Sequence, residues 1–260
     1  MIKVINIIQN EISKIFSRKK IYIFISILFI VALINLLNSL ITRNLFASQD
    51  YGQTFPLLLF DSVASLVIPI FVVVLIASMV TDEYLDGSLK LTLLRKVSRN
   101  QLLLGKMGAL FVVLFLLLLF LLIVGYTIGI SFFGWGKVFL LKGKELSSSQ
   151  GILFTLSVYT TSLLSYISFG MIILLFSVTI DNSGSVVALG LVTLISWVFI
   201  GEIFHKISPY LITDYFNTYN LFISNPSKEK IIFSFGVIFL YSISFYLLSF
   251  KIFNNKDLLK

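Results

Sequence analysis

The chain has 260 residues, of which 58% are hydrophobic and 12% are charged, about half the charged share of an average soluble domain. Its mean hydropathy is +1.01. So few charges cannot cover a water-soluble surface, and so many apolar residues exclude a disordered chain. The class that remains is an integral membrane protein. The formal charge of +8 is poorly explained by nucleic-acid binding, because no soluble basic domain carries it.

The chain has almost none of the histidine and cysteine side chains that bind metals or carry thiol chemistry. The chain contains no cysteine and a single histidine, His205. Disulfides are excluded, and one imidazole without thiolates is too small a ligand set for a zinc or haem site. We expect no metal site and no catalytic residue, and therefore a protein that is not itself an enzyme.

Six apolar runs are each long enough to cross about 30 Å of hydrocarbon as a helix. They are continuous and rich in Leu, Ile and Phe, whereas the strands of a membrane barrel alternate in polarity. The sequence thus predicts an all-α integral membrane protein in which residues 1–260 form one transmembrane domain. Pro69 predicts a kink in the second run. The runs are Ile21–Ile41, Leu57–Val80, Leu102–Phe133, Ile152–Ile180, Ser185–Phe204 and Ile231–Phe253.

The positions of the basic residues predict the orientation. Thirteen of the twenty Lys and Arg lie in residues 1–20, between the second run and the start of the third (including Lys106), or near the C-terminus. The other seven lie on the opposite side. Because cytoplasmic loops are enriched in Lys and Arg, we expect both termini in the cytoplasm. The abundance of Ile, Asn, Lys and Phe hints at an AT-rich bacterial genome, and hence at a bacterial cytoplasmic membrane.

Residues 1–20 are predicted to form an amphipathic helix rather than a span. Apolar side chains recur at intervals of four and three, which places them on one face of a helix. Such a helix lies flat in the membrane interface as an elbow before the first span. The simpler alternative is a plain topology anchor. The apolar positions are Met1, Ile5, Ile8, Ile12 and Ile15.

The loop at residues 81–100 is ordered by charge, with acids first and bases last. This order complements the dipole of a helix. Leu85, Leu89 and Leu93 form an apolar stripe, flanked by Glu83 and Arg95. A short helix of this kind suits docking into a groove of another protein. A solvated loop that obeys the positive-inside rule is the alternative.

A spaced pattern runs through this loop into the next span, at Glu83, Gly87, Ser88, Val97, Ser98, Arg99, Gly105 and Lys106. It resembles type-2 ABC permeases, the six-helix membrane subunits of ABC exporters. In that family Glu-x-x-x-Gly-Thr, a leucine-rich segment, Pro-Val-Ser-Arg and Gly-Lys follow the second span. The chain departs from the pattern at Ser88, where Thr is usual, and at Lys96, where Pro is usual.

The resemblance implies a type-2 ABC exporter permease fold and a transport role. It implies two copies of an ABC ATPase subunit, a second permease subunit, identical or different, and surrounding membrane lipid. The partner would bind ATP and Mg²⁺, and this chain would hold no cofactor. A substrate such as an antimicrobial peptide or a drug would be exported. The residues implied in ATPase coupling are Glu83, Leu85, Gly87, Leu89, Leu93, Arg95 and Arg99.

The chain does not carry the phosphate-binding loop of an ATPase. The nearest match, at 131–138, lacks the first glycine and the final hydroxyl of that motif. ATP hydrolysis must therefore come from another polypeptide. A self-contained secondary transporter is the alternative, and it would need carboxylates or broken helices at mid-membrane. An intramembrane enzyme is disfavoured, because the single histidine lies at the end of a span.

Polar residues within the spans suggest a candidate translocation path, although small and hydroxyl residues also serve helix packing. Asp61 and Glu202 lie near span ends, and Glu202 is expected to pair with His205 three residues on. Residues 205–230 are too apolar for a solvated loop and are expected to form a re-entrant or interfacial segment. The path residues are Asn35, Asn38, Ser157, Thr161, Ser165 and Ser168.

Overall fold

The computed structural model describes residues 2–46, 52–88, 97–136, 139–141, 144–223 and 228–256. It is a helical bundle in which six helices are long and apolar enough to cross a membrane. The chain is therefore a multi-pass membrane protein, as predicted. Five of the six are single helices, and the sixth is the interrupted second span described next. The five are α2 (Lys19–Phe46), α7 (Arg99–Phe133), α8 (Ser148–Thr179), α9 (Ser183–Ile203) and α11 (Lys228–Asn255).

The second span is interrupted, so the prediction of a single kinked helix at Leu57–Val80 is wrong in detail. Helix α3 (Phe55–Ala64) ends before Leu66, whose backbone leaves the helical region, and α4 (Val67–Ile76) follows. Pro69 has no N–H for the Ser65 carbonyl, and its ring collides with a helical carbonyl at that position. The helix therefore breaks one turn before the proline.

Beyond α4 the span continues through a π-helical turn (Ala77–Thr81) into α5 (Asp82–Leu85). The crossing segment is thus Val67–Leu85, displaced toward the C-terminal side of the predicted run. Gly87 then ends the helix in the left-handed conformation, at φ 71°. Residues 89–96 lie outside the described part of the chain, and with them Leu89, Leu93 and Arg95.

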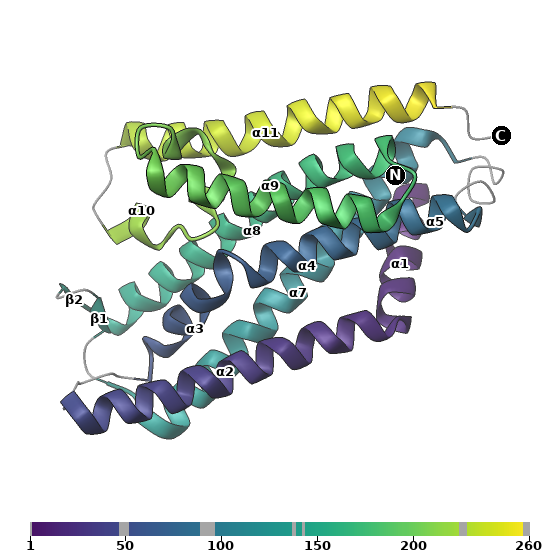
Figure 1. Cartoon of the computed structure of the whole chain (residues 1–260). Coiled ribbons are helices and arrows are strands. Elements are labelled where there is room, and N and C mark those ends of the chain that lie inside the picture. The colour runs from purple at the N-terminus through teal and green to yellow at the C-terminus, as the bar shows by residue number, and fades with distance from the viewer. Residues whose placement is uncertain are drawn as a thin grey trace.

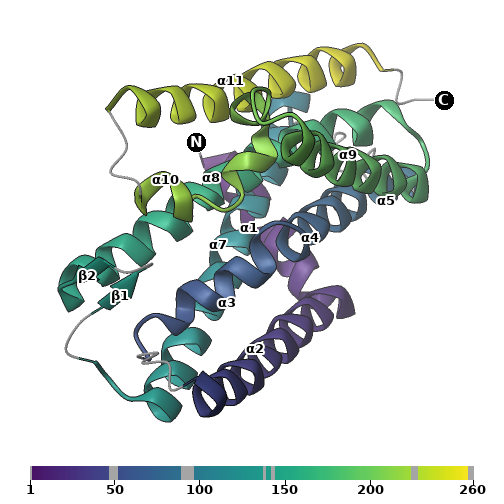
Figure 2. The ribbon, with the colours of Figure 1, turned by 60° about the vertical axis from the view of Figure 1, so that its left-hand side comes forward.

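The bundle has a buried centre and a loosely packed periphery. In the second span and α8, 72% of the most apolar window is buried, against 17% in α9 and 11% in α11. Figures 1 and 2 show α3, α4, α7 and α8 between α2 on one side and α9 and α11 on the other. The outer faces of α2, α9 and α11 are therefore left to lipid or to another protein.

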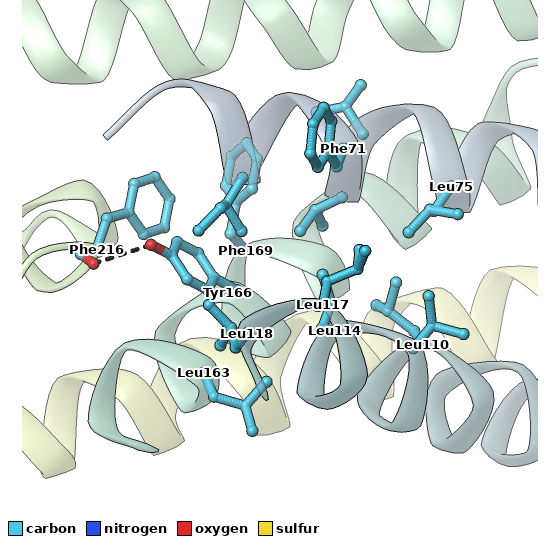
Figure 3. Packing of buried hydrophobic residues seen from close by; sticks show 14 of the residues in the cluster. Phe71, Leu75, Leu110, Leu114, Leu117, Leu118, Leu163, Tyr166, Phe169 and Phe216 are labelled. Carbon is cyan, nitrogen blue, oxygen red and sulfur yellow. Dashed lines mark hydrogen bonds between the residues drawn. The ribbon is translucent and has the colours of Figure 1, made fainter. Parts of the chain in front are cut away.

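The centre is filled by leucines of α7 and aromatic side chains of α4 and α8 (Figure 3). Tyr166 of α8 is fully buried, and its hydroxyl donates to the carbonyl oxygens of Ala64 at 3.0 Å and Phe216 at 3.1 Å. One buried phenol thus ties the broken second span to the segment after α9. A buried hydroxyl needs such partners, because leaving it unpaired costs about 1–3 kcal/mol.

The segment after α9 folds against the bundle. It forms short helical turns at Ser208–Tyr210 and Ile212–Tyr215, followed by α10 (Tyr219–Ile223). Ile212 and Phe216 are fully buried. Packing against the bundle therefore accounts for these two residues, whereas Ile207 and Tyr210 of the same segment are 46% and 60% exposed. The depth of the segment in the membrane remains a prediction.

One small hairpin departs from the all-α prediction within the described residues. Strands β1 (Phe139–Leu141) and β2 (Lys144–Leu146) pair antiparallel, with Phe139 opposite Leu146. Phe139 is fully buried against Gly151 at the start of α8. Its burial explains why an apolar segment lies between two helices.

Helix α1, the first helix, and the end of α11, the last, lie at the same end of the bundle (Figure 1). We call this end the terminal face; it carries α1 (Ile2–Ser17), α5, the turn between α8 and α9, and the last turn of α11. The opposite face carries the hairpin, the start of α3 and the segment between α9 and α11. An even number of spans produces this arrangement.

Candidate functional site

Four charged side chains from three segments meet in the interior of the terminal face. They are Glu11 and Lys14 of α1, Glu83 of α5 and Lys106 of α7, and we call them the buried ion cluster. The side chain of Lys106 is 1% exposed, and those of Glu11 and Glu83 are 3% and 6% exposed. Because buried charges are costly unless paired, each member depends on the others.

Lys106 is the centre of the cluster. Its Nζ donates to Glu83 Oε2 at 2.6 Å, to Glu11 Oε2 at 2.9 Å and to the Met79 carbonyl at 2.6 Å. An ammonium has three donors, so all of them are used. Helix α7 is thereby bound to α1 and to the π-helical turn through a single atom.

Lys14 closes the cluster on its more exposed side. Its Nζ donates to Glu11 Oε1 at 2.7 Å and to Glu83 Oε1 at 3.0 Å. Burial lowers the pKa of Lys14, but the hydrogen bonds and charges of Glu11 and Glu83 outweigh burial, so the pKa lies above its ordinary value. Lys14 is therefore protonated at neutral pH. The two carboxylates thus face two lysines, and Arg18 Nη2 lies 3.9 Å from Glu83 Oε1 at the edge of the cluster.

The π-helical turn supplies acceptors to this site. Within it, the Asp82 N–H bonds the Ala77 carbonyl, five residues back. The Ser78 carbonyl accepts from Arg18 Nη1 at 3.0 Å, and the next carbonyl accepts from Lys106. Such turns are frequent at functional sites. Here two side-chain cations bind successive carbonyls of the turn.

The helix expected at residues 1–20 forms at Ile2–Ser17, and its protein-facing side shares Ile15 with the predicted apolar stripe, of which Ile8 and Ile12 are partly buried. Ile7, Glu11 and Ile15 are buried, whereas Ile5 is 49% exposed. At Gly105 of α7, an added Cβ would lie 2.4 Å from a methyl carbon of Ile7. Helix α1 therefore packs tightly on α7, and this contact, rather than a lipid interface alone, selects the face.

The remaining motif residues also have structural roles. Ser98 caps α7: its hydroxyl accepts from the Gln101 N–H, while the Gln101 side chain accepts from the Ser98 N–H. The Ser88 hydroxyl donates to the Glu83 carbonyl at 3.2 Å, which closes the turn after α5. Together with Gly87, these residues shape the backbone around the ion cluster.

Arg99 is directed at the end of α11. Its Nη1 donates to the carbonyls of Phe253 at 2.6 Å, Asn254 at 2.8 Å and Lys256 at 2.8 Å. A cation at the carbonyl end of a helix is favoured by the helix dipole. In this structure Arg99 therefore holds α11 rather than presenting a charge to solvent.

Lys256 makes a second connection across the terminal face. Its Nζ donates to Asp181 Oδ1 at 2.5 Å and to the Val178 carbonyl at 3.1 Å, and it lies 4.2 Å from the Tyr84 ring centre. The turn between α8 and α9 is thus bound to α11 and α5. These contacts link the segments of the terminal face to one another, and we call the linked segments the platform.

An open hollow of about 400 Å³ adjoins this platform. Arg18, Lys20, Asp82 and Asp86 line it with charge, and Leu85 lines it with an apolar side chain that is 56% exposed. Of the residues predicted to couple to an ATPase, Leu85 is thus available at the surface, whereas Glu83 belongs to the interior. Glu83 was expected to act in ATPase coupling as a polar residue beside the apolar stripe. Its charge is paired inside the chain with Lys14 and Lys106, and its role in coupling stays a prediction.

The predicted path residues are not brought together. Asn35 of α2 donates to the Ser62 hydroxyl of α3 at 3.0 Å, and Asn38 is exposed on α2. Helix α8 lies beyond α3 and α7 from α2 in both views (Figures 1 and 2). In this chain the two groups therefore do not share one channel.

The hydroxyls of α8 serve the helices themselves. Ser157, Thr161 and Ser165 each donate to the carbonyl four residues back along α8. Ser168 instead donates to the Ile238 carbonyl of α11 at 2.5 Å and contacts the Ser242 hydroxyl. These contacts agree with helix packing, the alternative that the sequence left open.

The charges near the opposite face also have assigned places. Asn217 donates to Asp61, which binds the segment after α9 to α3. In the described part of the chain no hydrogen bond or ion pair joins Glu202 to His205, so the predicted pairing is wrong; both instead line an open cavity. Among the same residues no group of three or more His, Asp and Glu is arranged for a metal.

Sequence reasoning missed Glu11 as part of a site and treated Lys106 mainly as a topogenic charge. A signal was present, because Glu11 lies four residues from both Ile7 and Ile15 on an otherwise apolar stripe. A carboxylate at such a position is buried, and a buried charge is costly unless another group pairs with it. The partner itself, 95 residues away, was not readable from spacing.

Comparison with known proteins gives one family. Residues 52–259, from the turn before α3 to just beyond α11, match a family described as protein of unknown function, DUF2705. Helices α1 and α2 lie outside the matched region, which includes Glu83 and Lys106. A comparison with curated proteins finds no match.

Proposed function

The chain belongs to the DUF2705 family, and we propose that it is the membrane-spanning subunit of an ATP-driven ABC exporter. The observation that carries the proposal is the ion contact between Glu83 and Lys106 at 2.6 Å. These are the two charged residues at the ends of the pattern that resembles type-2 ABC permeases. Their contact brings the two ends of a linear pattern together in one site.

The terminal face has the features that an ATPase partner would need. The hollow around Leu85 combines an apolar side chain with charges of both signs. Directly beneath it, the ion cluster connects α5 to α1 and α7. A displacement imposed at the loop would therefore move three helices together, because separating them would expose or unpair buried charges.

The energetic requirement on such a partner is simple. The ATPase must bind two conformations of this chain with different affinities, since a partner that binds both equally does not shift the equilibrium between them. Two copies of the ATPase and a second permease subunit would complete the transporter. The exposed outer faces of α2, α9 and α11 leave room for that subunit. ATP and Mg²⁺ belong to the partner.

The proposal is tested by purifying the tagged chain with the products of its neighbouring genes and measuring ATP hydrolysis in the eluate. We expect an ATPase to co-elute and to be lost on Leu85→Asp and on Leu89→Asp, because a carboxylate in an apolar contact is costly. The matched control is Ile207→Asp, an exposed apolar residue of the opposite face, which should retain the ATPase.

A self-contained secondary transporter is the second candidate, and the broken span favours it, since such transporters use discontinuous helices. The break lies level with the middle of α8, because the Tyr166 hydroxyl donates to the carbonyl of Ala64, the last residue of α3. The candidate ranks second because it does not account for the pattern whose ends, Glu83 and Lys106, meet in one ion pair. Absence of any co-eluting ATPase would favour this candidate. An ATPase that is retained by both Leu85→Asp and Leu89→Asp would show that these leucines do not form the docking surface.

A further inference from the structure

The opposite face contains an open cavity of about 450 Å³ that the terminal face does not explain. It lies between the end of α9, the break between α3 and α4, and the short helical turns after α9. Two carboxylates line it, Glu202 and Asp214, together with His205, Ser65 and Ser208. Its lining includes no lysine or arginine from the described ranges. We call it the acidic cavity.

Two helices direct their carbonyl ends at this cavity. Ser65 follows the last residue of α3, and Glu202 lies in the last turn of α9. The carbonyl end of a helix carries a partial negative charge, at which acids are unfavourable and cations are stabilised. In addition, Pro69 cannot donate an N–H to the Ser65 carbonyl. Glu202 is therefore placed against its own helix dipole, and a bound cation would relieve that conflict.

An apolar groove of about 700 Å³ adjoins the acidic cavity, and Trp197 lines both. The groove lies between α9 and α11 and is lined by Phe233, Val237, Leu240, Tyr241 and Phe245. Trp197 packs edge-on against Tyr241, with 5.9 Å between ring centres. This contact connects the two peripheral spans at the point where the two hollows join.

The combined chemistry is that of one ligand with two parts. A cationic head would be attracted by Glu202, Asp214 and the helix ends, and the face of an indole also binds cations. An apolar chain would fill the groove, which runs from the opposite face toward the middle of α11. We propose that this chain binds an amphipathic cation, an ammonium group on an apolar chain, with its head in the acidic cavity and its tail between α9 and α11.

The site is a property of the chain alone and does not depend on the proposed ATPase. The chain has two tryptophans, so Trp135→Phe leaves Trp197 as the only indole reporter. This protein is placed in nanodiscs of zwitterionic lipid and titrated with brominated dodecyltrimethylammonium, whose bromines quench a nearby indole. We expect saturable quenching. Brominated dodecyl sulfate, which has the same chain and the opposite charge, should give only a linear decrease.

Substitution of the carboxylates separates binding from partitioning into lipid. Glu202→Gln with Asp214→Asn should weaken the apparent affinity for the cation about tenfold, as expected for the loss of two exposed ion pairs. Glu202→Gln alone leaves the Ser208–Asp214 hydrogen bond intact and should give a smaller loss in the same direction. Glu229→Gln removes an exposed carboxylate at the same end of the molecule, outside the cavity, and should change nothing.

Two sources of such a ligand are distinguished by a second probe, a brominated two-chain cationic lipid. Saturable quenching by the single-chain cation alone would assign the site to a free amphiphile, and saturable quenching by both would assign it to a membrane lipid as well. Linear quenching by both cations, or an affinity unchanged by the carboxylate substitutions, would overturn the proposal.

Discussion

Lys106 is a cation held almost entirely out of solvent by two carboxylates and a carbonyl. A buried ion pair is not in itself a large source of stability, because desolvation offsets much of the attraction. Removing one partner is a different matter, since the remaining charges stay buried without compensation. The ion cluster therefore specifies how three segments meet, and its effect is seen when it is broken.

We predict that Lys106→Met lowers the free energy of unfolding by about 3–5 kcal/mol, because Glu11 and Glu83 would be left buried with Lys14 at 2.7 and 3.0 Å and, for Glu83, Arg18 at 3.9 Å. Lys20→Met is the matched control. Lys20 pairs with Asp82 at 3.6 Å but is 48% exposed, so its loss should cost less than about 1 kcal/mol. Equilibrium unfolding in mixed micelles measures both values.

A double variant tests whether the cost arises from the unpaired charge. Glu83→Gln combined with Lys106→Met removes one charge of each sign and should cost less than the sum of the single variants. Equal losses for Lys106→Met and Lys20→Met, or strict additivity of the double variant, would contradict a coupled cluster.

At the scale of elements, the broken second span is held in place by the close approach of α7. At Gly129, an added Cβ would lie 2.2 Å from the Gly52 carbonyl oxygen, and at Gly125 it would lie 2.9 Å from the Pro56 Cα. Gly125 and Gly129, one turn apart on α7, thus let the start of α3 pack closely against the end of α7. Larger side chains would separate the two helices.

We predict that Gly129→Ala lowers the free energy of unfolding by about 1–3 kcal/mol, because its methyl group must displace backbone. Gly236→Ala is the control, a helical glycine of α11 with no atom within 4 Å of the added Cβ. That variant should gain up to about 1 kcal/mol from helix propensity. Destabilisation by both substitutions to the same extent would show that propensity, not the contact with Gly52, decides the result.

At the scale of the whole molecule, the terminal face carries the start of α1, the end of α11 and the basic residues Lys14, Arg18, Arg99, Lys106 and Lys256. If the positive-inside rule orients the chain, that face is cytoplasmic. The absence of cysteine makes the orientation easy to measure, since no background substitution is needed.

We predict that Ser185→Cys, in the first turn of α9 on the terminal face, is labelled by a membrane-impermeant maleimide only from the cytoplasmic side. Lys206→Cys, on the opposite face, should be labelled only from outside. Both positions are exposed. Labelling of intact cells and of inverted vesicles makes the comparison, and the reverse pattern would exclude a cytoplasmic partner at Leu85.

The spans were predictable because hydropathy is a local property. The fifth span was expected at Ser185–Phe204 and is observed at Ser183–Ile203, since lipid-facing apolar residues mark it directly. The second span was less well placed, because its break depends on whether Pro69 kinks or interrupts the helix, and that choice is made by packing. The contact of α1 with α7 was also missed, since the two helices are far apart in the sequence.

The sequence by itself determined a multi-pass helical membrane protein and the set of residues in its charged loop. Both follow from composition and from the spacing of apolar and charged residues, which can be read within one helical turn or one span. Only the tertiary structure decided that Glu11 and Lys106 belong with Glu83, that Arg99 holds α11, and that Glu202 faces a cavity. The physical reason is that a buried charge is satisfied by whichever partner the fold brings within about 3 Å. That distance is set by the packing of helices far apart in the chain.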